Sequence, residues 1–227
     1  MIDFVLRFFD VLLSGVALLL LSPILLCIAG LLKITGEGDV LYKQVREGKN
    51  GKKISIIKFA TMLRDSEKLE GGTVTRANDP RVLPIGAILR KYKINELPQL
   101  WNIFCGDMSL VGPRPQTARC FDAFPTSAKI AIHKVRPGLT GIGSLIFRDE
   151  ESLLEGQTDP DAFYDDVIMR YKGELEEWFV GNRSLKIYIY AIVLTVWMVC
   201  FKNVAAVFFV FSKLPQPPIT LTKVFKN

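Results

Sequence analysis

Asn95 and Glu96 come close after a basic run that opens at Arg90 and ends at Lys93. A carboxylate near a helix N-terminus, with basic neighbours and a metal ion, has the parts of a phosphoryl-transfer centre. The same residues suit plain helix capping, because asparagine is a strong N-cap and glutamate fits a first helical turn. On this short segment alone, capping is the better interpretation.

Two other segments place a cation on an extended or stiff backbone. Lys58 lies between Ile57 and Phe59 in a stretch typical of a strand. Arg114 lies between Pro113 and Pro115, so its backbone is fixed before any ligand arrives. Its planar guanidinium suits bidentate phosphate binding. Taken alone, the Lys58 pattern is also explained by a surface lysine, and the Arg114 pattern by a rigid turn.

A further segment, residues 136–141 (RPGLTG), begins with Arg136 and continues through Gly138 and Thr140. Glycines allow backbone N–H groups to approach an anion, as in phosphate-cradling nests. The spacing is not that of a Walker A motif. An ordinary turn explains this segment as well.

Local patterns predict the elements that would position these side chains. Two strands are expected around the turn signal Asn50-Gly51, at Val40–Val45 and Ile54–Met62. Helices are expected where apolar spacing and capping residues agree. They are Leu63–Leu69, Ile85–Lys93 with Pro84 in its first turn, Glu96–Phe104 capped by Asn95 and ended by Gly106, and the acidic helix Asp161–Phe179.

Val11 to Leu32 is an uncharged stretch of 22 residues, long enough for a transmembrane helix. Ser22-Pro23 lies at its centre, and proline kinks or breaks a helix. Each half then covers roughly 16 Å, too short to cross a hydrocarbon core of ~30 Å. The segment is either a kinked spanning helix or a re-entrant helix that returns to its own side. Residue physics alone favours the spanning form.

The C-terminal apolar region is interrupted by a charge. Ile187–Phe201 is followed by Lys202 and then by Val204–Phe211. A lysine inside a span costs about 2.5 to 3.5 kcal/mol. We therefore expect helices that lie on or partly in the cytoplasmic leaflet.

Composition and charge narrow the classes of partner. The chain is 49% hydrophobic with a net charge of +6, and its mean hydropathy is +0.26. Residues 33–136 hold 19 Lys and Arg against 10 Asp and Glu. A basic middle suits an anionic bilayer surface or a phosphate-bearing substrate. Nucleic acid is not expected as a partner, since no nucleic-acid-binding motif is recognisable.

Taken in order, these segments resemble the bacterial sugar transferases, monotopic polyprenyl-phosphate phosphoglycosyl transferases that initiate glycoconjugate, capsule or O-antigen assembly. The likeness runs from about Phe4 to Trp197, and the combined order of motifs is highly specific. It is carried by Ser22-Pro23, Lys58-Phe59 and residues 95–99 (NELPQ), 106–109 (GDMS), 112–115 (GPRP) and 136–141 (RPGLTG).

The resemblance implies an α/β fold: a mostly helical monotopic membrane protein with a re-entrant N-terminal helix and a small β-hairpin. It divides the chain into a membrane helix (1–35), a cytoplasmic catalytic domain (36–183), and C-terminal membrane-surface helices with a tail (184–227). It places the protein on the cytoplasmic face of the bacterial inner membrane, in contact with membrane lipids. The oligomeric state stays open, with a homodimer as one alternative.

The implied reaction moves a sugar phosphate from a UDP-sugar to undecaprenyl phosphate, giving undecaprenyl-diphospho-sugar and UMP with Mg²⁺ as cofactor. In the family an aspartate of an Asp-Glu pair attacks the β-phosphate, and the lipid phosphate then displaces the phosphosugar. Carried over, the catalytic and metal-binding positions are Asn95 and Glu96. The implied substrate-binding residues are Lys58, Arg90, Pro113, Arg114, Pro115, Arg136, Gly138 and Thr140.

The chain departs from the family pattern at residue 95, where asparagine replaces aspartate. A neutral amide cannot form the same acyl phosphate, and loss of a nucleophile costs on the order of a million-fold in rate in other enzymes. Three explanations stay open: an engineered substitution, a natural variant in which Glu96 or the lipid phosphate attacks, and an inactive relative that serves as a scaffold or substrate-binding partner. The sequence does not identify the sugar.

Overall fold

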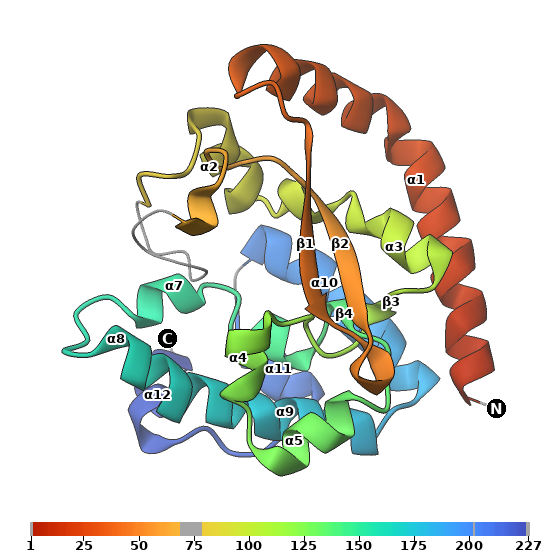
Figure 1. Ribbon diagram of the computed structural model, residues 1–227. Helices are drawn as coiled ribbons and strands as arrows, with labels where there is room; N and C mark the ends of the chain where they lie inside the picture. The colour runs from red at the N-terminus through yellow and green to blue at the C-terminus, as the bar shows by residue number, and fades with distance from the viewer. Residues whose placement is uncertain (1, 69–78, 202, 226–227) are drawn as a thin grey trace.

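The computed structural model describes residues 2–68, 79–201 and 203–225, and it is mostly helical (Figure 1). The N-terminal half contains α1 (Ile2–Thr35), β1 (Leu41–Glu47), β2 (Lys53–Phe59), α2 (Pro84–Lys91), α3 (Gln99–Cys105) and β3 (Ser109–Val111). The C-terminal half contains α4 (Ala118–Asp122), α5 (Thr126–Ile132), β4 (Gly138–Thr140), α6 (Ile142–Ile146), α7 (Glu150–Leu153), α8 (Pro160–Phe163), α9 (Arg170–Gly181), α10 (Leu185–Phe201), α11 (Ala205–Val210) and α12 (Ile219–Phe225).

The predicted β-hairpin is confirmed. Strands β1 and β2 pair antiparallel from Leu41 opposite Phe59 to Glu47 opposite Lys53. Asn50 and Gly51 both have positive φ in the connection, as expected for residues that tolerate the left-handed region. Within the predicted helix Leu63–Leu69, the described residues 63–68 form only a 3₁₀ turn, from Ser66 to Lys68, and Leu69 lies outside the described residues.

Helix α1 arches along one side and over the top of the molecule (Figure 1). It has 34 residues and stays helical through Pro23, so the predicted backbone break at Ser22-Pro23 is wrong. The hydroxyl of Ser22 donates to the carbonyl of Leu19 at 2.8 Å. This carbonyl lacks its usual backbone donor because Pro23 has no N–H. By length and composition, α1 is the one described helix long and apolar enough to cross a membrane.

The N-terminal half of α1 is tied to the globular part by polar contacts. Asp10 is buried in this helix. Its carboxylate accepts hydrogen bonds from the backbone N–H of Leu110 (2.8 Å) and from the hydroxyls of Ser109 (3.0 Å) and Tyr188 (2.8 Å). Such a carboxylate is costly to bury without these donors, so the contacts fix the position of the helix.

The C-terminal end of α1 is tied to the same body by apolar packing. Leu32 is fully buried in a cluster with Phe59 of β2 and Leu89 of α2. The first turn of α1 is held as well, through an ion pair between Asp3 and Arg183. Both ends of α1 therefore contact one folded unit, although the outer face of the helix exposes large apolar side chains such as Leu19 and Leu20.

Two short parallel strands bring distant loops side by side. In β3 and β4, Ser109 pairs with Gly138 and Val111 pairs with Thr140. The backbones approach so closely that a Cβ at Gly138 would lie 2.1 Å from the backbone nitrogen of Gly112. The sequence does not predict this sheet, because three-residue strands leave no periodic signal.

The main core lies among α5, α6, α9 and α10. It includes Ile142, Ile168 and Leu175, which are fully buried. The segment 184–227, predicted as membrane-surface helices and tail, also contributes to this core through Val207 and Leu221. The predicted acidic helix 161–179 forms as α8, a π-helical stretch (Tyr164–Met169) and α9.

Candidate functional site

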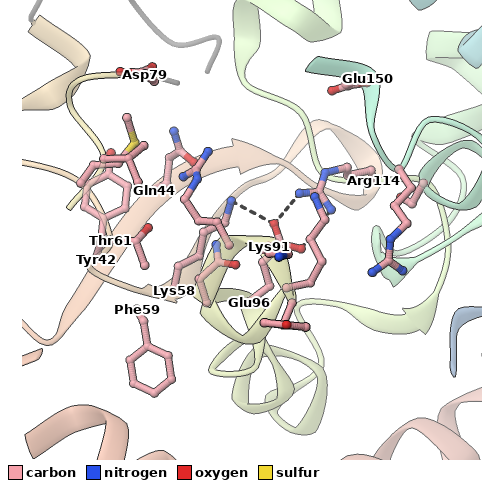
Figure 2. Close-up of a pocket in the computed structure, with 18 of the residues that line it drawn as sticks. Tyr42, Gln44, Lys58, Phe59, Thr61, Asp79, Lys91, Glu96, Arg114 and Glu150 are labelled. Atoms are coloured by element: carbon pink, nitrogen blue, oxygen red, sulfur yellow. Dashed lines mark hydrogen bonds and ion pairs between the residues drawn. The ribbon is translucent and has the colours of Figure 1, made fainter. Parts of the chain in front are cut away.

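A large cleft of about 1540 Å³ opens between the hairpin, α2, the turn before α3, α6 and α10. Figure 2 shows Lys58 and Arg114 pointing at the carboxylate of Glu96 from opposite sides. Glu150 lies beyond Arg114 in this view, and Asp79 lies toward the opposite end. These charged groups come from segments far apart in the chain, so the fold assembles the site.

Glu96 is the centre of the charged network. Arg114 donates from Nη1 to Oε2 at 3.1 Å and from Nη2 to Oε1, so the guanidinium binds the carboxylate in a bidentate manner. The Nζ of Lys58 lies 3.6 Å from the same Oε1. Glu96 is only 8% exposed, so these two cations compensate a buried negative charge.

The three groups shift one another's pKa. Burial lowers the pKa of Lys58 to about 7, although the negative charge of Glu96 opposes that change. Burial would raise the pKa of Glu96, but the positive charges of Arg114 and Lys58 outweigh it and hold this pKa far below its usual range. The charge of Glu96 raises the pKa of Arg114 further. At neutral pH the Glu96–Arg114 pair is ionised, and Lys58 is the group poised to titrate.

The backbone around Asn95 differs from the predicted capped helix. Ile94–Glu96 forms a 3₁₀ turn, and the following helix α3 begins only at Gln99, after Pro98. Asn95 is therefore not an N-cap, and that part of the prediction is wrong. Its side-chain Oδ1 is buried at the edge of the cleft and has no hydrogen-bond partner among the described residues. A buried amide oxygen left without a donor is available to a ligand.

Four further predicted residues differ in their place relative to the cleft. Arg90 and Thr140 line the cleft with Lys58, Asn95, Glu96 and Arg114. Pro113 and Pro115 do not line it, but they flank Arg114 in the chain and restrict its backbone. The hydroxyl of Thr140 lies 2.7 Å from that of Thr195 in α10.

Arg136 and Gly138 lie away from this cleft. The Nε of Arg136 donates to the carbonyl of Gly106 at 2.8 Å, next to a small separate hollow beneath α1. The backbone N–H of Gly138 donates to the carbonyl of Pro113 at 2.8 Å, and that of Gly112 donates to Thr140 at 2.9 Å. These N–H groups hold the two loops together, and that of Gly138 already has a backbone partner, so a substrate role for Gly138 stays a prediction. A substrate role for Arg136 stays a prediction.

The cleft also contains polar residues that motif reading missed. Tyr42, Gln44 and Arg46 line it from β1, on the face that they share by period-two alternation. Tyr42 pairs directly with Lys58 across the hairpin. That alternation was a usable signal once Lys58 was singled out. The lysine at 172 and the glutamate at 150 gave no comparable signal, because they meet only through tertiary packing.

Comparison with known proteins shows the family of the chain. The model of the family described as bacterial sugar transferase matches residues 1–202. The chain belongs to this family. The resemblance carried by the ordered motifs is thus confirmed, and the sugar transferase is an enzyme of the phosphoglycosyl transferase type.

Relatives of this sugar transferase carry names from polysaccharide assembly. It is 39% identical over 184 residues to the exopolysaccharide production protein PSS of Rhizobium leguminosarum bv. phaseoli, covering 79% of this chain and 86% of that protein. It is 40% identical over 160 residues to the exopolysaccharide production protein ExoY of Rhizobium meliloti, covering 64% and 70%.

A third relative has a name that states a reaction. The UDP-glucose:undecaprenyl-phosphate glucose-1-phosphate transferase of Escherichia coli K12 is 36% identical over 176 residues. The match covers 75% of this chain but 36% of that protein, so the sugar transferase corresponds to a part of it.

Proposed function

We propose that this sugar transferase moves a sugar phosphate from a UDP-sugar to undecaprenyl phosphate, giving undecaprenyl-diphospho-sugar and UMP. The observation that carries the proposal is the buried Glu96 carboxylate, held by Arg114 and Lys58 inside a large cleft. Phosphoryl transfer depends chiefly on positioning and charge stabilisation, which a guanidinium fork and an ammonium supply. The name of the Escherichia coli relative supports the same pair of substrates.

Each charged group has a distinct task in this proposal. Arg114 exchanges its contact with Glu96 for two oxygens of the donor diphosphate, since carboxylate and phosphate match the same fork. Lys58 supplies a point charge on the opposite side of Glu96. Glu96 keeps both cations in place before the donor arrives, so little side-chain ordering remains when the diphosphate binds.

Magnesium is proposed as the cofactor of the same centre. The side-chain oxygens of Asn95 and Glu96 are the hard ligands that this ion prefers, and Asn95 Oδ1 has no other partner in the described chain. No three metal-binding side chains cluster anywhere in the described residues, so substrate phosphates and water would complete the shell. When bound, the ion would neutralise charge on the phosphates.

Asn95 raises a second candidate function, a scaffold that binds UDP-sugar or the lipid intermediate without turnover. The amide cannot act as the aspartate nucleophile of the family, and Glu96 is already engaged by two cations. Turnover in this chain would then use Glu96 or the lipid phosphate as nucleophile. An engineered Asp-to-Asn substitution would also give a chain that binds without reacting.

We also propose that the protein sits on the cytoplasmic face of the bacterial inner membrane, with α1 re-entrant in the lipid. At 1.5 Å per residue, α1 is about 51 Å long and exceeds a ~30 Å hydrocarbon core. Yet Asp3 and Leu32, near its two ends, both contact the same folded unit. A helix anchored at both ends on one body supports entry and exit on one side.

The experiment that tests the reaction is UMP release. The purified chain is incubated with Mg²⁺, undecaprenyl phosphate and each of a panel of UDP-sugars. The enzyme proposal predicts UMP release with at least one sugar, and release that requires the lipid phosphate. A scaffold binds a UDP-sugar and releases no UMP, and that result would favour the second candidate.

A further inference from the structure

The end of the cleft formed by α6, α9 and α10 differs in chemistry from the end formed by the hairpin and α2. The hairpin end is rich in cations from β1, β2 and α2, including Arg46, Lys58 and Arg90. The α10 end combines polar groups, among them Ser144, Lys172 and Thr195, with apolar side chains. One cleft thus has two compartments on either side of the Glu96–Arg114 pair.

Ser144 is the polar group with no assigned task. Helix α6 buries Ile142, Leu145 and Ile146 in the core, which fixes the helix and leaves Ser144 beside the cleft. Its Oγ is shielded from solvent, and no described residue is its hydrogen-bond partner. A buried hydroxyl without a partner is destabilising unless a ligand or water satisfies it.

Lys172 is the charged group of the same compartment. It is 1% exposed, and its Nζ donates to the carboxylate of Glu150. The Nζ also lies 5.4 Å from the ring centre of Phe147, which holds the side chain in position. This arrangement repeats the one at Glu96: a buried cation is kept in place by a carboxylate that an incoming phosphate would replace.

The wall of this compartment on α10 is apolar and continues to the protein surface. Val196 and Val199 line the cleft while remaining 64% and 45% exposed. Ile189, Val193 and Trp197 are exposed on the same helix, at spacings that share a face with Val196. The opposite face of α10 is buried through Tyr188, Ala191 and Leu194. Apolar side chains of α10 thus line the cleft and continue onto the exposed face of the helix.

We propose that this compartment binds the acceptor, with the phosphate of a long-chain isoprenoid phosphate at Ser144 and Lys172 and its hydrocarbon chain along the exposed face of α10. The inference rests on the proposed function and names the acceptor's place in the same cleft. The occupant follows from its two parts: a phosphate satisfies the orphaned hydroxyl and the buried ammonium, and only a hydrocarbon chain matches the apolar face at Val196. The cleft volume of about 1540 Å³ exceeds the ~300 to 1,000 Å³ typical of sites for one small ligand, which leaves room for donor and acceptor together.

The test is equilibrium binding of farnesyl monophosphate, a short isoprenoid phosphate, to the full chain in detergent, beside separate titrations with UDP. Ser144→Ala is expected to weaken farnesyl monophosphate binding about tenfold, the loss of one hydrogen bond to a charged group, and to leave UDP binding within twofold. Val196→Gln is expected to weaken farnesyl monophosphate binding as well, with UDP binding again unchanged. The matched control is Ser152→Ala, because this serine also lines the cleft but its hydroxyl already donates to the carbonyl of Asp149 at 2.7 Å.

Further measurements distinguish failure of the acceptor site from failure of the proposed function. Unchanged farnesyl monophosphate affinity in both Ser144→Ala and Val196→Gln would overturn the acceptor site, and so would competition of UDP for the same site. Equal competition by phosphatidylglycerol would overturn it too, since the compartment would then hold any anionic lipid. If the proposed function itself fails, the unmodified chain binds no UDP-sugar and releases no UMP, whatever the Ser144 variant does.

Discussion

Arg114 and Glu96 meet as a matched fork, with one guanidinium nitrogen on each carboxylate oxygen, 3.1 Å apart for Nη1 and Oε2. The pair joins the loop after β3 to the turn before α3, inside the cleft that Lys58 also faces. A diphosphate offers Arg114 the same geometry as the carboxylate does. The donor diphosphate can therefore replace the Glu96 carboxylate as the partner of Arg114, and no new arrangement of charges has to form.

Arg114→Ala is expected to weaken UDP-sugar binding by about 1.5 to 3 kcal/mol, the range for hydrogen bonds to charged groups. Arg114→Lys should recover only part of this loss, because an ammonium cannot make the paired contact. Titration calorimetry with the donor measures both. The control is Arg119→Ala, which removes a more exposed ion pair with Asp165 and should leave donor affinity unchanged. Unchanged donor affinity in both Arg114 variants would show that this loop has only a structural role.

Donor affinity should fall as pH rises through about 7. Below that pH Lys58 is an ammonium, and above it the amine is neutral, because burial has lowered its pKa to about 7. Glu96 and Arg114 remain ionised across this range, since their pKa values are shifted away from neutrality in opposite directions. The expected loss between pH 6 and 8.5 is about tenfold in Kd. Lys58→Arg should flatten the profile, and an equally steep profile in that variant would contradict the assignment.

Gly138→Ala should destabilise the protein. Its Cβ would lie 2.1 Å from the nitrogen of Gly112 and 2.4 Å from the carbonyl oxygen of Thr140, and backbone cannot yield as a side chain can. Overpacking of about 3 kcal/mol would lower the apparent Tm by roughly 6 to 12 °C. Gly181→Ala is the control, since no atom lies within 4 Å of its added Cβ. A thermal scan in detergent compares the two, and equal Tm values would contradict the close packing of β3 and β4.

Both ends of α1 should be accessible from the cytoplasmic side. In a variant without native cysteines, Ile2→Cys and Gly38→Cys are expected to resist an impermeant maleimide added to intact spheroplasts and to react once the membrane is opened. Labelling of Ile2→Cys from outside would show that α1 spans the membrane. Replacing Ser22 and Pro23 by leucine should shift the helix toward spanning, since the proline kink would be lost.

Much of the site could be predicted from sequence because its motifs are local. Each motif alone leaves Lys58, Glu96 and Arg114 open to a purely structural explanation, but the combined order of the motifs resembles one family, and the turn signal predicts the hairpin. The start of α3 was misplaced because Asn95 suits a cap on propensity alone, whereas the chain continues through a 3₁₀ turn to Pro98. Proline at 23 does not end α1, and the hydroxyl of Ser22 donates to the carbonyl of Leu19 in the turn before the proline.

Local sequence patterns do not predict contacts that form only through long-range packing. The pairing of β3 with β4 uses the N–H groups of Gly112 and Gly138, although the motif at residues 136–141 alone suggested that its glycine N–H groups were available to an anion. Arg136 was chosen for the same motif but contacts Gly106 outside the cleft. Burial of Ser144 beside Lys172 depends on how α6 meets α9, and no sequence spacing records that meeting.

The central claim, that Glu96 is the centre of a working phosphoglycosyl transferase, is tested most directly by UMP release from matched variants. The chain as given, Glu96→Gln and Asn95→Asp are each incubated with Mg²⁺, undecaprenyl phosphate and the UDP-sugar that the panel selects. The account predicts turnover in the chain as given, and a loss on the order of a hundred-fold or more in Glu96→Gln, because the neutral amide no longer holds Arg114 and Lys58. Turnover confined to Asn95→Asp, with a phosphosugar adduct on the protein, would instead identify the given chain as a substrate trap. Robust UMP release that survives Glu96→Gln would contradict the account.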